Sequence, residues 1–201
     1  MIYGMLGPAV ISGSNVSHLY RMPGFLDAES CARIRRAMDA GDADQAEVLD
    51  GTIAARDRVR RAWSIEPEAS IIREVEQCLD RQCQAIARFF GIPLSGREGT
   101  GFLRYPPGGF YMPHRDRAVL ASWPDAARRA IAVIVFLNGS RDGQPDGEFD
   151  GGTLRLFVEG DVVDVAPRPG LLVAFAADLL HEVTAVQGGT RDAVVDWFYG
   201  S

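Results

Sequence analysis

The segment Leu103–Asp116, LRYPPGGFYMPHRD, combines turn-forming glycines and prolines with aromatic residues, and it ends in a His-x-Asp pair. In a β-strand, the side chains of residues i and i+2 point to the same face. We therefore expect the imidazole of His114 and the carboxylate of Asp116 to lie side by side. A second histidine, His181, stands in another strand-like run, LLHEV, at 179–183.

Two histidines and one carboxylate on one face of a metal leave the opposite face open, which is the ligand pattern of non-haem Fe(II) sites. A basic residue, Arg191, follows His181 by ten positions and precedes the apolar stretch 193–198. An arginine in such a stretch is better explained by a buried anionic partner than by a surface ion pair. His-x-Asp alone is a weak signal, but together with His181 and Arg191 it favours a metal site over a structural histidine.

Two other motifs are excluded by their context. The triplet His-Arg-Asp also occurs in kinase catalytic loops, but here the following asparagine, an Asp-Phe-Gly and a glycine-rich nucleotide loop are missing. His181-Glu182 does not continue as His-Glu-x-x-His, so the zinc-protease motif is absent.

The motifs together resemble the 2-oxoglutarate- and Fe(II)-dependent dioxygenases, specifically the prolyl-4-hydroxylase-like branch, from about residue 25 to residue 198. The elements that carry the resemblance are, in chain order, Tyr105, Gly108-Gly109, His114-Arg-Asp116, Phe136-Leu-Asn138, Gly151-Gly-Thr-Leu-Arg-Leu-Phe157, Pro167-Arg-Pro-Gly170, His181 and Arg191.

The resemblance implies that His114, Asp116 and His181 are the iron ligands and the catalytic centre. It implies cofactor-binding roles for Arg191, Tyr105 and, more weakly, Thr153. Arg191 would hold the distal carboxylate of 2-oxoglutarate, because a planar guanidinium meets a carboxylate with two parallel hydrogen bonds. The implied cofactors are Fe(II), 2-oxoglutarate and O2, with ascorbate as an optional addition.

The formal charges of this implied site nearly cancel. Iron, one aspartate, the 2-oxoglutarate dianion and one arginine sum to about zero, which lets a low-dielectric cavity hold several full charges. In one position the chain departs from the family, because Phe136 stands where some members carry a tyrosine that binds 2-oxoglutarate. Phenylalanine keeps the ring but lacks the hydroxyl.

Three functions are compatible with the sequence. The resemblance favours hydroxylation of a C–H bond, with succinate and CO2 as coproducts, in a prolyl residue of a peptide or protein; the alternative substrate is a free amino acid or other small metabolite. A second hypothesis, nucleic-acid demethylation, is disfavoured because the last strand has Arg191 but lacks the second arginine and the asparagine of the repair branch. The third is a non-enzymatic, cupin-like metal-binding module, and manganese or zinc could occupy the same ligands as iron.

Composition limits the class of protein further. The chain has 201 residues, a net charge of −6 and a pI near 5.1, which argues against a nucleic-acid or anionic-membrane partner. Its apolar runs are too short to span a bilayer. The three cysteines form no regular framework, so we expect reduced thiols packed in the core and a cytoplasmic protein. The oligomeric state is left open.

Helical periodicity followed by many short strands with glycine and proline turns predicts an α+β, mainly β, sandwich or barrel. The resemblance implies that this is a double-stranded β-helix (jelly-roll) barrel braced by N-terminal helices. We expect a single domain over residues 1–201, with helical support at about 25–91 and the jelly-roll core at about 99–199. Helices are predicted from Asp27 to Gly41 and from Pro67 to about Phe90. Eight strands are predicted near 101–106, 109–115, 130–137, 152–158, 161–166, 171–176, 181–187 and 191–199, after a short strand at 18–21.

The remaining segments are predicted to be polar loops. Residues 42–62 show no clear period and are predicted to form a loop or frayed helix. We interpret their arginines Arg56, Arg58, Arg60 and Arg61 as a solvated face rather than a site for an acidic substrate. The insertions 117–129 and 139–150 lie beside the proposed ligand strands and are predicted to select the substrate. Tyr111 and Trp123 are candidate aromatic residues on the substrate side, although packing explains Trp123 equally well. His18 is expected at the surface.

Overall fold

The computed structural model describes residues 18–47, 58–120 and 122–201. The expectations for Arg56 and for the N-terminal residues before His18 lie outside these ranges. Within the described part of the chain, no helix combines the length and the apolar character needed to cross a membrane.

Both predicted helices are present. Helix α1 (Ala28–Ala40) begins after Asp27, whose carboxylate accepts a hydrogen bond of 2.7 Å from the Ser30 backbone N–H. Helix α3 (Ala69–Phe90) ends at Gly91, which adopts the left-handed conformation (φ 65°) that favours glycine. The strands are β1 (Leu19–Met22), β2 (Asp42–Gln45), β3 (Arg60–Arg61), β4 (Trp63–Glu66), β5 (Leu94–Arg97), β6 (Gly101–Tyr105), β7 (Phe110–His114), β8 (Arg129–Phe136), β9 (Asp150–Gly151), β10 (Leu154–Val158), β11 (Asp161–Val165), β12 (Leu172–Ala176), β13 (His181–Val183), β14 (Val186–Gly188) and β15 (Arg191–Gly200).

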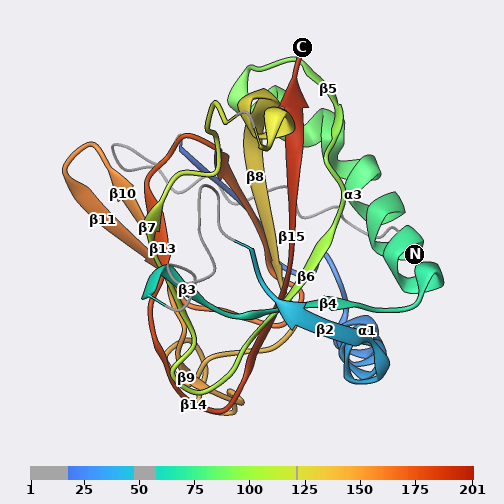
Figure 1. The fold of residues 1–201 in the computed structure, drawn as a ribbon, viewed down its shortest axis with the longest axis vertical. Helices are drawn as coiled ribbons and strands as arrows, with labels where there is room; N and C mark the ends of the chain where they lie inside the picture. Colours follow the sequence, from blue (N-terminus) through green and yellow to red (C-terminus); the bar gives the residue numbers. More distant parts are fainter. Residues whose placement is uncertain (1–17, 48–57, 121) are drawn as a thin grey trace, which may run out of the picture.

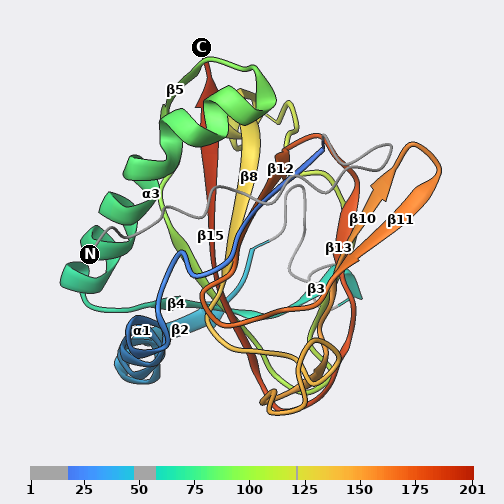
Figure 2. The same ribbon diagram turned by 180° about the vertical axis from the view of Figure 1, so that it is seen from behind.

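Two sheets face each other, as expected for a jelly roll (Figure 1). The major sheet has the order β1-β12-β8-β15-β6-β4-β2, with β5 also paired to β15. The minor sheet has the order β11-β10-β13-β7-β3. The hairpin β10–β11 projects away from the body of the molecule (Figures 1 and 2). This mainly β fold with helical support confirms the predicted fold class.

Alternation along the strands divides the core into two layers. In β8, the side chains of Ile131, Val133 and Val135 pack toward the helices, in a cluster with Ile34 and Leu79. The intervening residues of the same strand, Ala132, Ile134 and Phe136, pack between the two sheets. Figure 2 shows α1 and α3 on the side of the major sheet away from the minor sheet.

Some predictions for the loops and strand boundaries were wrong. Residues 42–62, expected to be a loop or frayed helix, contribute β2 and β3, and β4 and β5 were not predicted. These strands are short and largely exposed, so they show no hydrophobic alternation. The single strand expected at 181–187 is divided into β13 and β14. The apolar stripe of α3 is buried at Ile71, Val75, Leu79 and Ile86, but Phe89 is 42% exposed.

The expectations for the other outlying residues hold. His18 lies at the surface, with its imidazole 3.8 Å from the Glu159 carboxylate. The three cysteines are free, and they belong to the core beneath the major sheet or pack against it.

Candidate active site

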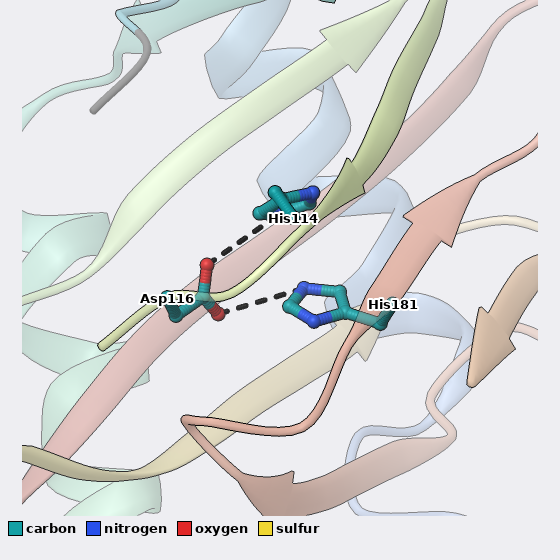
Figure 3. Close-up of side chains that lie close together, drawn as sticks. All are labelled: His114, Asp116 and His181. Atoms are coloured by element: carbon teal, nitrogen blue, oxygen red, sulfur yellow. Dashed lines mark ion pairs between the residues drawn. The ribbon is translucent and has the colours of Figure 1, made fainter. Parts of the chain in front are cut away.

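The two candidate histidine ligands lie directly opposite each other across the minor sheet. His114 of β7 pairs in register with His181 of β13, and their ring centroids are 4.1 Å apart. The Asp116 carboxylate lies between them: Oδ1 is 3.4 Å from Nε2 of His114, and Oδ2 is 3.6 Å from Nε2 of His181 (Figure 3). Potential donor atoms of all three residues lie within 4.8 Å of one another.

Asp116 lies beside His114 for a reason other than the strand alternation that the sequence suggested. Strand β7 ends at His114, so Asp116 lies in a bend rather than in a strand. Its backbone N–H, and that of Arg117, donate to the carbonyl of Ala177, each at 2.9 Å. The bend therefore brings the carboxylate back beside His114, where the strand periodicity alone had predicted it.

Hydrogen bonds fix the orientation of both imidazoles. Nδ1 of His114 lies 2.8 Å from the Met112 carbonyl, and Nδ1 of His181 lies 2.9 Å from the Leu179 carbonyl. A carbonyl only accepts, so each Nδ1 carries the proton and each Nε2 presents a lone pair toward Asp116. Histidines that bind metals are commonly held in this way through the other ring nitrogen. The donor set thus fits a divalent metal ion.

Burial and charge keep His181 and Asp116 in the protonation states that a metal requires. Burial lowers the pKa of His181 to about 4, so this imidazole is neutral at pH 7. Burial alone would raise the pKa of the Asp116 carboxyl, but contact with His181 and His114 outweighs it and holds this pKa well below its usual range.

Arg191 is a buried arginine whose hydrogen-bonding capacity is not satisfied. The residue is 1% exposed, and Nε and Nη2 are buried without hydrogen-bond partners. Its Cζ lies 4.9 Å from the ring centroid of Tyr105 and 5.2 Å from that of Phe136. Burial lowers the pKa of Arg191 from its ordinary value. Unpaired buried N–H donors are rare because they lose their hydration, so this guanidinium fits the carboxylate that the sequence predicted for it.

A cavity of about 60 Å³ contains the three candidate ligands. Its other walls are mostly aromatic and aliphatic, with two arginines and one glutamate. The lining residues are Glu47, Arg60, Leu103, Tyr105, Tyr111, His114, Asp116, Trp123, Arg129, Ala132, Val133, Ile134, His181, Val183, Val195 and Trp197. The predicted residues Tyr105 and Tyr111 therefore reach the cavity. So does Trp123 from the insertion 117–129, whose role in selecting the substrate stays a prediction.

Other predicted residues lie elsewhere. Thr153 sits between β9 and β10, where its backbone N–H donates to the Thr184 hydroxyl at 2.9 Å, and it does not line the cavity. Its cofactor-binding role stays a prediction. In the insertion 139–150, Glu148 and Asp150 form ion pairs with Arg35 and Arg141 at 2.8 Å each.

Arg129 was not predicted from the sequence as a site residue, but it donates a hydrogen bond to the backbone carbonyl of Asp116. Arg129 is 2% exposed, pairs with the Glu98 carboxylate, and donates through Nη1 to the Asp116 carbonyl at 3.1 Å. Its guanidinium lies 3.8 Å from a ring centroid of Trp197 and 5.0 Å from that of Trp123. The sequence signal for Arg129 was a charged residue at the start of the eight-residue apolar strand β8. The signal for Trp197 was its position on the same face of β15 as Arg191, because side chains alternate along a strand.

Comparisons with known proteins agree with this site. Residues 100–199 match the 2OG-Fe(II) oxygenase superfamily. A PKHD-type hydroxylase of Stenotrophomonas maltophilia is 30% identical over 185 residues, covering 89% of this chain and 77% of that protein. A PKHD-type hydroxylase of Thioalkalivibrio sulfidiphilus is 29% identical over 177 residues, covering 86% and 74%.

Solved structures show the same fold. A prolyl-4-hydroxylase of Pseudomonas putida superposes with a TM-score of 0.69 at 29% identity, covering 90% of this chain and 92% of that one. A prolyl hydroxylase of Trichoplax adhaerens, solved with a peptide fragment of hypoxia inducible factor, superposes with a TM-score of 0.74 at 20% identity, covering 92% and 84%. With a double-stranded β-helix and a His-Asp-His cluster beside a buried arginine, the chain belongs to the 2OG-Fe(II) oxygenase superfamily, a family of dioxygenases that use Fe(II), 2-oxoglutarate and O2.

Proposed function

We propose that the protein hydroxylates a C–H bond of a prolyl residue in a peptide or protein, and that succinate and CO2 are its coproducts. The observation that carries the substrate class is the 29% identity to a prolyl-4-hydroxylase that covers nine tenths of both chains. The PKHD-type hydroxylases at similar identity support the hydroxylase assignment. We also propose that helical support and jelly roll form one domain.

In this proposal, Nε2 of His114, Nε2 of His181 and one oxygen of Asp116 hold the iron. Bound Fe(II) supplies, with 2-oxoglutarate and O2, the oxidising power for C–H hydroxylation. The hydrogen bonds that the two Nδ1–H groups donate to the Met112 and Leu179 carbonyls keep each Nε2 directed at one point, so the protein is preorganised before the metal binds.

In this proposal the cosubstrate extends from the cavity toward Arg191, which lies opposite the cavity residue Tyr105 on the paired strands β15 and β6. Arg191 donates from Nε and Nη2 to the distal carboxylate, which recovers the hydrogen bonds that this buried guanidinium lacks. The Tyr105 hydroxyl binds the same cosubstrate, and the apolar walls formed by Leu103, Ile134 and Val183 exclude water. Thr153 is a weaker candidate for binding the cosubstrate.

The test is mass spectrometry of proline-containing peptides, and of cell extract, after incubation with protein, Fe(II) and 2-oxoglutarate. The expected result is the gain of one oxygen on proline, with succinate formed in equal amount. Succinate formation without any oxidised proline would support the alternative substrate, a free amino acid or small metabolite. Absence of iron-dependent 2-oxoglutarate consumption would contradict the dioxygenase reaction itself, and full turnover by His114→Ala would contradict the ligand assignment.

A further inference from the structure

Arg60 lies in the same cavity as the candidate metal ligands. It belongs to β3, where it pairs with Tyr111 of β7, and its side chain lines the cavity. The next residue, Arg61, lines a separate groove with Trp63. Because side chains alternate along a strand, the two arginine side chains point to opposite faces of the minor sheet. The expectation that this arginine cluster is a solvated face is therefore wrong for Arg60.

The guanidinium of Arg60 is held in place by two contacts. Its Cζ lies 4.6 Å from the ring centroid of Tyr111, and that ring stacks on the His114 imidazole with centroids 3.4 Å apart and planes at 18°. Its Nη1 donates a hydrogen bond of 2.6 Å to the Glu47 carbonyl. These contacts fix a positive charge one aromatic ring away from a candidate metal ligand.

The hydrogen bonds of Arg60 leave one edge of the guanidinium available. Nη1 is used by Glu47, whereas Nε is buried without a hydrogen-bond partner. The edge formed by Nε and Nη2 presents two parallel N–H groups, which match the two oxygens of a carboxylate. A buried donor without a partner costs free energy that a bound anion would recover.

The positive charge of Arg60 is also not required to neutralise the site with its cofactors bound. The formal charges of iron, Asp116, 2-oxoglutarate and Arg191 sum to about zero without it. The other arginine of the cavity, Arg129, is ion-paired with Glu98. Among the described residues, the ion pairs of the structure do not include Arg60. Glu47, whose carbonyl accepts the Arg60 hydrogen bond, also lines the cavity.

We propose that Arg60 is a specificity-determining residue that binds a carboxylate of the substrate close to the C–H bond that is oxidised, an inference that rests on the proposed function. Two sources offer the same planar anion: an aspartate or glutamate beside the proline of a peptide, and the carboxylate of a free amino acid. Both would meet the Nε–Nη2 edge of Arg60 in the same way.

The experiment compares matched acidic and neutral probes. One pair consists of peptide pools with a central proline flanked by Asp or Glu, or by Asn or Gln. The other pair is L-proline and L-prolinamide. Oxidation is followed by mass spectrometry as kcat/KM with Fe(II) and 2-oxoglutarate. We expect wild-type protein to prefer the acidic member of one pair by at least about tenfold, as a charged hydrogen-bonded pair should give.

Variants assign the preference to the residue. Arg60→Gln should oxidise both members equally, and Arg60→Lys, which keeps the charge but loses the fork, should retain part of the preference. Arg61→Gln is the matched control, because it removes the same charge from the neighbouring position on the other face. It should behave as wild type. The Mn(II) affinity and thermal midpoint of each variant show whether it is folded.

Each result decides the proposal. Equal oxidation of acidic and neutral probes by wild type, or a preference that survives in Arg60→Gln, would overturn it. If no probe is oxidised, binding of both pairs to protein loaded with Mn(II) and 2-oxoglutarate is measured by calorimetry. Tighter, Arg60-dependent binding of the acidic member would then support the anion site while prolyl hydroxylation fails; equal binding would refute the anion site.

Discussion

Arg191 and Tyr105 lie directly opposite each other on the paired strands β15 and β6, with the guanidinium carbon 4.9 Å from the tyrosine ring centroid. This pairing holds the positive charge against an aromatic face, which is one of the few favourable neighbours that a buried guanidinium can have without an anion. The N–H groups on Nε and Nη2 of Arg191 have no hydrogen-bond partner among the described residues.

We predict that Arg191→Met stabilises the protein without its cofactors but abolishes cosubstrate binding. Removing buried, unpaired N–H groups should raise the free energy of unfolding by about 1–3 kcal/mol. Urea unfolding without metal or 2-oxoglutarate measures this gain. Added 2-oxoglutarate with Mn(II) should raise the thermal midpoint of the wild type and not that of the variant. A destabilised variant would mean that Arg191 has a structural partner.

We predict that His181→Ala, like His114→Ala, loses divalent-metal binding. Removing one of three protein ligands leaves the ion held by one imidazole and one carboxylate, and affinity should fall by at least about a hundredfold, beyond the effect of removing an outer-shell partner. Calorimetry with Mn(II) under anaerobic conditions measures the change. His18→Ala is the matched control, because His18 is a surface histidine paired only loosely with Glu159. Equal Mn(II) affinity in all three variants would refute the assignment.

The buried pair Arg129–Glu98 should matter for both stability and metal binding. Removal of one partner, in Arg129→Met or Glu98→Leu, leaves a buried or half-buried charge unpaired and should cost about 3 kcal/mol. The double variant should lose clearly less than the sum of the two single losses. Arg129→Met should also weaken Mn(II) binding, because the Asp116 carbonyl loses its donor. Additive losses would show that the two side chains are energetically independent.

The pH dependence of the metal-free protein should reflect His181. Its pKa is about 4 in the folded protein and about 6.5 in an unfolded chain. Between these values the unfolded state binds more protons, so stability rises with pH and is lost on acidification below about pH 6.5. From pH 7 to pH 5 the expected loss from this group is on the order of 2 kcal/mol. Urea midpoints in the presence of a chelator measure it, and His181→Gln should remove this part of the slope.

Sequence patterns predicted the elements whose signals are local. Helix α1 is marked by Asp27 and Gly41 at its ends, and α3 by a regular apolar stripe and Gly91. The strands of the jelly roll are bounded by glycines and prolines. The resemblance assigned His114, Asp116 and His181 to one metal, and potential donor atoms of these three residues lie within 4.8 Å of one another.

The remaining features depend on neighbours that are distant in sequence. Strand β2 forms because it pairs with β4 at the edge of the major sheet, and its own residues are mostly exposed. Arg129 gains its role from Glu98 and from the Asp116 carbonyl, and Arg60 gains its role from pairing with Tyr111. A pattern within one segment does not specify which strand becomes its neighbour.

Strand β15 joins the active site to the hydrophobic core within a single segment. Val195 and Trp197 line the cavity from one face of it, which Arg191 shares by alternation, while Val194 and Phe198 on the other face pack toward the helices. Substitutions within these ten residues therefore affect both the substrate range and the thermal stability of the protein. Insertion or deletion of one residue here would exchange the two faces, so this segment tolerates substitution better than any change of length.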